Sequence, residues 1–219
     1  HRDLHSFPTR RSSDLGNFDF TTPEQFQPRA EIMIEGKKVV WEACQTFSGS
    51  WGYHRDEAEW RSVENLVQTL IDCVSKDGNL LLNVGPTARG EFDGRALERL
   101  RGIGTWMRRH SRSIYGCTKA PEEFQVPQDA RLTYNPQTKR LYVHLFAWPY
   151  KHVHLDGAYR DRVEYAQLLH DGSEVRMKGL EDWQLSHAGG IERTPTLSLT
   201  LPQRRPDVTV PVVELFLKD

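Results

Sequence analysis

The sequence predicts an α/β domain followed by an all-β domain. Strand, loop and helix patterns alternate twice between residues 37 and 110, an order that favours a parallel sheet. Beyond about residue 118, short alternating runs are separated by Gly, Pro and Asp turns, which is typical of an antiparallel β-sandwich. We therefore expect one domain over residues 16–118 and a second over 119–219, with the boundary near 119–123.

Composition narrows the classes of function. The 219 residues carry a formal net charge of -1 and are 27% charged, so nothing in the balance suggests binding to nucleic acid or to an anionic membrane. No apolar stretch is long enough to span a bilayer. The three cysteines, Cys44, Cys73 and Cys117, have neither paired nor metal-ligand spacing, so we expect buried free thiols and no metal site. The run "GPTARG" lacks the Lys-Ser/Thr of a phosphate-binding loop, and no cofactor is expected.

The first fifteen residues do not have the sequence pattern of a folded protein. Residues 1–15, "HRDLHSFPTRRSSDL", lack hydrophobic periodicity and the apolar core of a signal peptide. They correspond to the translation of a common short-read sequencing adapter. We therefore expect residues 1–15 to be an assembly artefact, with coding sequence beginning near Gly16 and the chain truncated at its amino end.

The α/β part begins with "KKVVWEAC" (37–44), a candidate strand bounded by an aromatic loop. A helix is predicted from the cap residue Ser62, with Gly78 as its stop. The apolar run "NLLLNVGP" (79–86) predicts a strand buried on both faces. A second helix follows, and its last residues, 108–110, suit the negative end of the helix dipole.

The all-β part is predicted from its alternating runs. "ARLTYNPQTKRLYVHLF" reads as a hairpin around an Asn-Pro turn. His152 and His154 alternate on a later strand, so both should face the same side. Further strands are expected in "RVEYAQLL", "SEVRMK", "TLSLTL" and "DVTVPVVELFL".

Two loops follow the predicted parallel strands, and ligands bind such loops at the carboxyl ends of the strands. They are "QTFSGSWGYHRD" and "GPTARGEFDG". The rings of the first loop could stack on a sugar or pack inward under the loop. The segment "GNFDFTTPEQFQPRAEI" (16–32), which contains Pro23 and Pro28, is expected to be an irregular loop. Glu24 lies in this loop before the first strand, whereas Glu42 lies on the strand, where an unpartnered carboxylate would be costly to bury.

Residues 22–116 resemble the α-L-fucosidases, which are retaining glycoside hydrolases. The matching pieces are "TPEQ", "WEACQTFSGSWGYHRD", "LVQTLIDCVSKDGNLLLNVGPTARGEF" and "ERLRGIGTWMRRHSRSIYG". The resemblance implies the last strands and helices of a (β/α)₈-like barrel, followed by an antiparallel β-sandwich. It also implies hydrolysis of fucosylated glycans or glycoconjugates by double displacement, in an extracellular, periplasmic or lysosomal location.

The resemblance implies roles for three residues. Glu24 of "TTPEQF" matches the acid/base of the family, with Glu42 as the second candidate. Trp51 of "SWGY" matches the ring that packs against the apolar side of fucose. The nucleophilic aspartate of the family belongs to an upstream strand and is not assigned here, so we expect the chain as given to be inactive.

Two other functions are compatible with the sequence. The protein could be a non-catalytic carbohydrate-binding or structural protein, although Trp148, Tyr150 and Trp183 form no obvious stripe and are expected to cover the junction of barrel and sandwich. It could also be another barrel glycosidase, against which the run "NLLLNVGP" argues.

Overall fold

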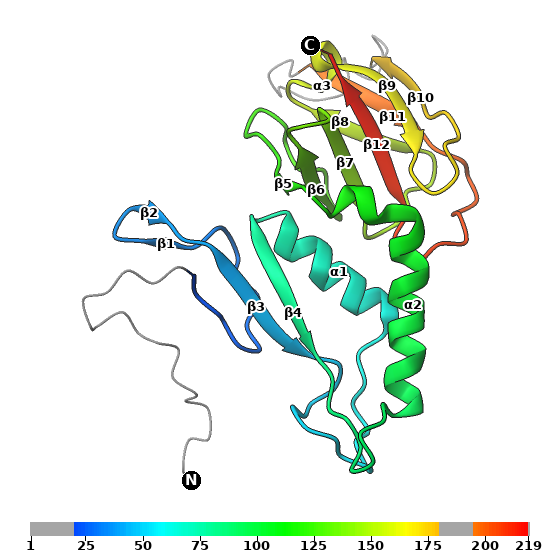
Figure 1. Ribbon diagram of the computed structural model, residues 1–219. Helices are drawn as coiled ribbons and strands as arrows, with labels where there is room; N and C mark the ends of the chain where they lie inside the picture. Colours follow the sequence, from blue (N-terminus) through cyan, green and yellow to red (C-terminus); the bar gives the residue numbers. More distant parts are fainter. Residues whose placement is uncertain (1–19, 180–194, 219) are drawn as a thin grey trace. The chain divides into compact units, whose positions relative to one another are not determined.

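The computed structural model describes residues 20–179 and 195–218. The chain forms two compact units that divide between Gly102 and Ile103. The first unit is α/β and the second is largely antiparallel β-structure, in the order that the sequence predicts (Figure 1). Among the described residues, no helix has the length and apolar character needed to cross a membrane.

The first unit contains two pairs of strands and its helices. The strands are β1 (Met33–Ile34), β2 (Lys37–Lys38), β3 (Trp41–Thr46) and β4 (Gly78–Asn83). The helices are α1 (Val63–Val74) and the first part of α2 (Gly94–His110). β1 and β2 form a short antiparallel hairpin, while β3 and β4 pair in parallel from Trp41 with Gly78 to Thr46 with Asn83.

The predicted strand over 37–44 is divided in the structure. Its first two residues form β2, Val40 is 58% exposed between the strands, and β3 begins only at Trp41. The turn at Glu35 and Gly36, both with positive φ, folds β2 back on β1, and residues 39–40 then lead from β2 to β3. The β-branched pair at 39–40 therefore marks a connection instead of a strand.

Helix α1 begins as predicted but ends earlier. The Ser62 hydroxyl accepts a hydrogen bond from the backbone N–H of Asn65 at 3.1 Å, which caps the first turn. The helix ends with Ser75 as its C-cap, and Asp77 takes the positive φ of the turn. Gly78 is therefore the first residue of β4 and not the helix stop. A Cβ there would lie 2.2 Å from the Trp41 ring, so only glycine fits beneath that indole.

The prediction that β4 is buried on both faces is wrong for the described chain. Leu80 packs with Trp41, Ala43 and Cys73 in the small core of the first unit. Leu81 points to the other face and is 50% exposed. A continuous apolar run is typical of a strand that is covered on both faces within a complete sheet. Here β3 is the only described strand that pairs with β4, so part of the run is exposed.

The second unit is a two-sheet β-structure. The strands are β5 (Thr118–Lys119), β6 (Ala130–Asn135), β7 (Arg140–Leu145), β8 (His152–Asp156), β9 (Val163–Leu168), β10 (Arg176–Gly179), β11 (Thr196–Thr200) and β12 (Val212–Leu217). One sheet has the order β5-β6-β7-β12-β9 and the other β10-β11-β8, with antiparallel pairing throughout. The short helices η1 (Ser111–Ser113) and α3 (Tyr159–Arg162) complete the unit.

Residues from both sheets form one hydrophobic core, as expected for a sandwich. It includes Leu132, Val143, Leu155, Leu199 and Leu215, all at most 2% exposed. Trp183, one of the aromatics considered in the sequence, lies outside the described residues.

The C-terminal half of α2 belongs with the second unit, which explains why the division falls inside a helix and before the 119–123 segment named from the sequence. The Trp106 indole donates a hydrogen bond to the Val210 carbonyl at 2.9 Å. The His110 ring stacks on Trp106 at 4.8 Å and is fully buried, which lowers its pKa to about 4. His110 is thus neutral near pH 7 and does not add positive charge at the helix end.

Candidate active site

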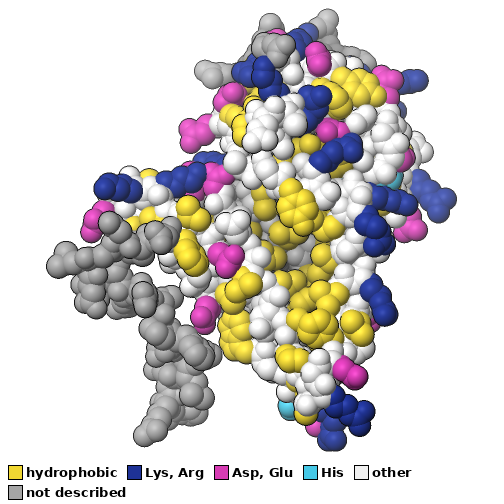
Figure 2. Space-filling view, viewed as in Figure 1, with side chains coloured by type: hydrophobic (Ala, Val, Ile, Leu, Met, Phe, Trp, Pro, Cys, Tyr) yellow, Lys and Arg dark blue, Asp and Glu magenta, His cyan; other side chains and the backbone are white. Residues whose placement is uncertain are grey.

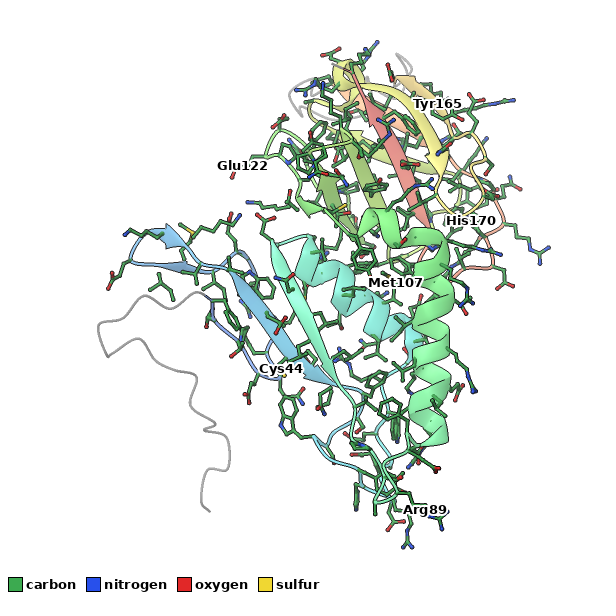
Figure 3. The ribbon with its side chains drawn as sticks, viewed as in Figure 1. Cys44, Arg89, Met107, Glu122, Tyr165 and His170 are labelled. Carbon is green, nitrogen blue, oxygen red and sulfur yellow. The ribbon has the colours of Figure 1, made fainter. Side chains whose placement is uncertain are left out.

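The two loops singled out in the sequence leave the same edge of the β3–β4 pair, because the strands are parallel and in register. The Asn83 side chain at the end of β4 donates a hydrogen bond to the Trp51 carbonyl at 2.7 Å. A Cβ on Gly85 would lie 2.4 Å from the Tyr53 backbone nitrogen. The loops therefore pack directly against each other, and Figure 3 shows Arg89 at the tip of the second one.

The aromatic residues of the first loop divide into packed and exposed rings. Phe47 is 2% exposed and belongs to the interior. Trp51 and Tyr53 are 39% and 40% exposed. Both alternatives left open by the sequence therefore occur within one loop. The exposed rings can meet a ligand, and the buried one fixes the base of the loop.

The aromatic loop is closed at its base and braced inside. Ser48 pairs with Trp60, and the Arg61 N–H donates to the Phe47 carbonyl at 2.9 Å. Across the loop, the Glu57 carboxylate accepts hydrogen bonds from the Glu59 N–H at 3.0 Å and the Ser50 hydroxyl at 2.8 Å. These bonds hold the pKa of Glu57 below its ordinary value, because they stabilise the carboxylate form.

Two arginines one turn apart on α2 contact the aromatic loop. The Arg95 and Arg99 guanidinium groups lie 4.8 and 5.1 Å from the centre of the Trp60 ring. Arg95 also donates to the Glu57 carbonyl at 2.8 Å, and Arg99 donates to the Arg61 carbonyl at 2.6 Å. The exposed rings are thus carried on a loop with several fixed points.

Glu24 and Glu42 are brought together although they are far apart in the sequence. The segment around Glu24 is not the irregular loop that the sequence suggests, because it runs parallel to β3. Thr21 N–H donates to the Val40 carbonyl, and Gln25 N–H donates to the Cys44 carbonyl, both at 2.9 Å. Glu24 therefore stands beside Cys44, and side chains in register on neighbouring strands point to the same face.

Cys44, labelled in Figure 3, neighbours both acids on that face, because it pairs with Glu24 and follows Glu42 by two residues on β3. Burial raises the pKa of the Cys44 thiol, and the negative charges of Glu24 and Glu42 raise it further. Glu24 is exposed and Glu42 is half-buried, whereas Trp41 and Ala43 on the opposite face are fully buried. The strand therefore separates a core face from a polar face that carries both candidate acids.

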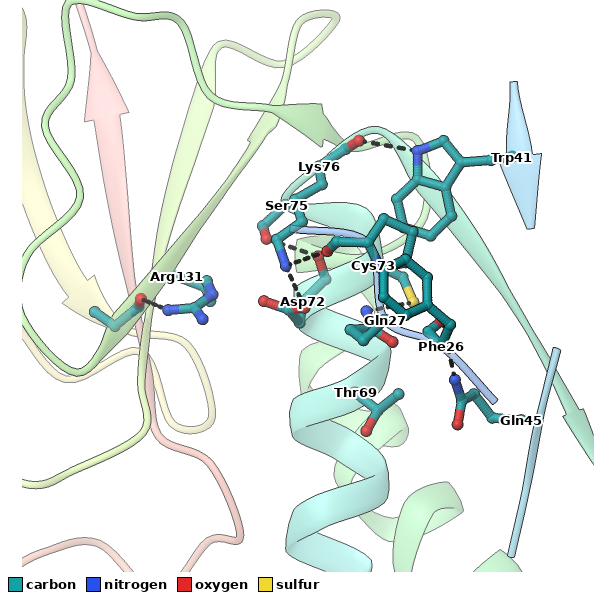
Figure 4. A network of polar contacts seen from close by, with 12 residues as sticks. Phe26, Gln27, Trp41, Gln45, Thr69, Asp72, Cys73, Ser75, Lys76 and Arg131 are labelled. Carbon is teal, nitrogen blue, oxygen red and sulfur yellow. Dashed lines mark hydrogen bonds and ion pairs between the residues drawn. The ribbon is translucent and has the colours of Figure 1, made fainter. Parts of the chain in front are cut away.

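A polar network holds the Glu24 segment in place (Figure 4). Gln25 donates to the Thr46 hydroxyl at 2.9 Å, and Gln27 donates to the Cys73 sulfur at 3.1 Å. Lys76, in the turn after α1, donates to the Pro28 carbonyl at 2.8 Å and to Asp72 at 2.5 Å. Backbone pairing and side-chain anchors together fix the position of Glu24.

The thiols agree only in part with expectation. All three cysteines are free, but only Cys73 is fully buried. No group of three or more His, Cys, Asp or Glu residues within 20–179 and 195–218 has a geometry that could hold a metal ion.

A separate cleft lies on the second unit. Its volume is about 600 Å³, and its lining includes Gln125, Gln128, Trp148, His152 and His154. The two histidines share one strand face, as predicted, with ring centres 6.1 Å apart. The Trp148 indole donates to the Pro202 carbonyl at 3.2 Å, which fixes the orientation of the ring.

Sequence reasoning missed the residues that position the first loop. Asn83, Glu57, Arg95 and Arg99 make no motif by themselves. The available signals were the polar residue that ends the apolar strand and the i, i+4 spacing of the two arginines on the following helix.

A parallel strand pair with candidate acids on one face, a following loop with exposed rings and a later antiparallel sandwich are compatible with the barrel-and-sandwich architecture of a glycoside hydrolase. Residues 8–112 match the family model described as α-L-fucosidase. This match covers 105 of the 219 residues, just under half of the chain, and identifies the segment as related to the α-L-fucosidases.

Similar proteins agree with this assignment. Rat plasma α-L-fucosidase is 37% identical over 113 residues, which are 50% of this chain and 25% of that protein. The structure of α-L-fucosidase isoenzyme 1 from Paenibacillus thiaminolyticus is 36% identical with a TM-score of 0.81, covering 92% of this chain and 45% of that one. The Thermotoga maritima α-fucosidase, solved with a mechanism-based inhibitor, is 27% identical with a TM-score of 0.69, covering 92% and 43%. The matches thus span about a quarter of the curated relative and under half of the solved chains.

Proposed function

We propose that this chain is the C-terminal part of a retaining α-L-fucosidase that removes terminal α-L-fucosyl residues from glycans or glycoconjugates. In this proposal, β3 and β4 are the last strands of a (β/α)₈-like barrel. The observation that carries the proposal is the pairing of the Glu24 segment with β3. It puts two carboxylates on one face of β3, the strand that leads into the braced loop exposing Trp51.

Each candidate residue then has a chemical role. Glu24 protonates the leaving oxygen and later activates water, with Glu42 as the alternative for this role. A retaining enzyme needs a second carboxylate as nucleophile, with the two groups roughly 5–5.5 Å apart. Trp51 buries the methyl side of fucose against its ring, since a deoxy carbon offers an apolar face.

The nucleophilic aspartate has no assigned counterpart among the 219 residues. The chain by itself is therefore expected to leave an aryl α-L-fucoside unhydrolysed. Measurable turnover by the purified chain would contradict that expectation. A longer protein carrying the upstream region of the family is expected to hydrolyse the same substrate.

The acid/base assignment is tested in that longer protein with Glu24→Gln and Glu42→Gln. Loss of the acid should slow substrates with poor leaving groups far more than activated ones, because activated leaving groups depart without protonation. Azide should restore turnover of an activated substrate, since an anionic nucleophile needs no base. The control is Glu98→Gln, whose side chain is 78% exposed on α2.

The outcome decides between the candidates. Leaving-group dependence and azide rescue in the Glu24 variant alone support Glu24. The same behaviour in the Glu42 variant alone moves the role to Glu42. Wild-type rates in both variants would remove both acids from the mechanism.

A non-catalytic carbohydrate-binding role is the second candidate, and the cleft at Trp148 favours it. A fixed ring beside the Gln125 and Gln128 amides and two histidines suits a neutral sugar. Binding of neutral oligosaccharides to the full chain, lost in Trp148→Ala and kept in Tyr115→Ala, would support this role. If the longer protein also fails to hydrolyse any α-L-fucoside, binding becomes the better description.

A further inference from the structure

A second, larger cavity lies within the second unit, apart from the candidate active-site residues. It is bordered by the C-terminal half of α2 and by the connection between β11 and β12. Its volume is about 1160 Å³, which is large enough for more than a single small ion. Its lining residues are Thr105, Trp106, Arg109, His110, Arg204, Arg205, Pro206, Asp207, Val208 and Thr209.

The charge of this lining is strongly positive. Three arginines face a single acid, Asp207. Arg205 is tied to the Thr209 carbonyl at 2.5 Å. In contrast, Arg109 and Arg204 are exposed and form no hydrogen bond or ion pair with any residue that the structure describes. Figure 2 shows Lys and Arg side chains along α2, at the right of the view.

Unneutralised guanidinium groups around one cavity repel each other, and a bound anion would relieve that repulsion. A guanidinium group also matches the geometry of a carboxylate or a sulfate ester, to which it can donate two parallel hydrogen bonds. The rest of the lining is mixed, with the hydroxyls of Thr105 and Thr209 beside the apolar Pro206 and Val208. Such a mixture of hydroxyl and apolar surface suits a sugar ring better than a bare ion.

The base of the cavity is rigid and uncharged. Trp106 is 3% exposed and bound to the Val210 carbonyl, which anchors the end of the loop that carries Arg204. The ring nitrogen Nδ1 of His110 lies 2.9 Å from the Trp106 carbonyl, which can only accept, so Nδ1 carries the proton. The buried Nε2 therefore keeps a free lone pair and has no hydrogen-bond partner among the described residues. His110 is thus a neutral acceptor under the arginines and not a fourth cation.

From these observations we propose that the cavity between α2 and the β11–β12 connection binds an anionic saccharide, one that carries a carboxylate or a sulfate ester. The site is separate from the proposed fucosidase chemistry and does not depend on it. It would hold a charged part of a glycan by Arg109 and Arg204.

Calorimetric titration of the full chain tests this proposal. The probes are a sulfated tetrasaccharide, its desulfated counterpart, a uronate-containing tetrasaccharide and sodium sulfate, all at equal ionic strength. We expect the sulfated or the uronate probe to bind more tightly than sodium sulfate. Added sodium chloride should weaken that binding, because exposed charges are screened. The stronger of the two charged probes identifies the source of the anionic group.

Variants assign the binding to the cavity. Arg109→Gln and Arg204→Gln should each weaken binding of the preferred charged probe by about tenfold or more, as expected for a charge-assisted hydrogen bond. Arg160→Gln is the matched control, since Arg160 is also an exposed helical arginine of the second unit but does not line the cavity. Binding of the neutral probe should not respond to any of the three changes.

Three results would overturn the proposal. One is wild-type affinity for every charged probe in the double variant of Arg109 and Arg204. Another is an equal loss of affinity in Arg160→Gln. The third is binding of sodium sulfate as tight as that of either charged saccharide, which would reduce the cavity to an ion site.

Discussion

Acidification from pH 7.5 to 5.0 is predicted to destabilise the second unit through two buried histidines. His110 and His144 are both fully buried. Burial lowers the pKa of His110 to about 4 and that of His144 to about 3. In the unfolded chain both groups return to ordinary values near 6.5. The unfolded state therefore binds more protons than the folded state between these limits.

The hydrogen bonds explain why both rings stay neutral. The Thr133 hydroxyl donates to the Ser113 carbonyl at 2.7 Å, so it must accept from the Nε2–H of His144 at 2.9 Å. That assignment leaves Nδ1 of His144 as a buried lone pair without a partner among the described residues. Protonation there would create a buried cation near His110, with no counter-charge among the described residues.

The magnitude follows from proton linkage. Because both folded pKa values are depressed, the full stability is present above about pH 6.5 and is lost as pH falls toward the folded values. At pH 5.0, each histidine should cost about 2 kcal/mol relative to neutral pH. Together they should remove about 4 kcal/mol if they act independently, a large part of the stability of an ordinary domain.

The assay is urea unfolding of the full chain at both pH values, followed by tryptophan fluorescence. His110→Phe keeps a ring stacked on Trp106 but removes the titration, so the pH dependence should fall by about 2 kcal/mol. His154→Gln is the control, because His154 is exposed on β8 and the variant keeps both buried histidines. Titration of the imidazole C–H resonances by NMR in the wild-type chain gives the pKa values directly.

Two observations would refute the reasoning. Resonances of His110 and His144 that titrate near pH 6.5 in the folded chain would show that burial does not keep them neutral. An unchanged pH dependence in His110→Phe would show that other groups set the acid sensitivity.

The remaining predictions concern the first unit. Gly78→Ala should lower the free energy of unfolding by about 1–3 kcal/mol, because its Cβ would clash with the Trp41 ring; an unchanged urea midpoint would contradict this. Ser62→Ala should cost about 1 kcal/mol through loss of the α1 cap, measured in the same way. Cys73 should react with an aromatic disulfide reagent only after unfolding, since burial raises the pKa of its thiol to about 11. Cys44, only half-buried, should react first in native protein.

The elements with strong periodicity were predictable from the sequence. The α1 cap at Ser62, the parallel order of β3 and β4, and the hairpin of β6 and β7 follow from local patterns that agree with their tertiary setting. For the rings of the aromatic loop the sequence left two alternatives open, and the structure shows both, with Phe47 buried and Trp51 exposed.

Other features depend on contacts that no local pattern records. Gly78 was predicted to end the helix because glycine often follows helices. In the structure, glycine is required at this position because a Cβ would clash with the Trp41 ring on the neighbouring strand. His110 was predicted to suit the negative end of the helix dipole as a cation, but its burial in the folded chain lowers its pKa and keeps it neutral. The segment at Glu24 was predicted to be a loop because it contains two prolines, and no sequence pattern indicates its backbone pairing with β3.

That pairing makes the length of the Glu24 segment a constraint in its own right. Side chains alternate between faces along an extended backbone, so inserting one residue between Thr21 and Glu24 would turn the carboxylate to the α1 side of β3. Inserting two would restore the face but displace the carboxylate by about 6.6 Å along the strand. The identities of the intervening residues can therefore vary more freely than their number.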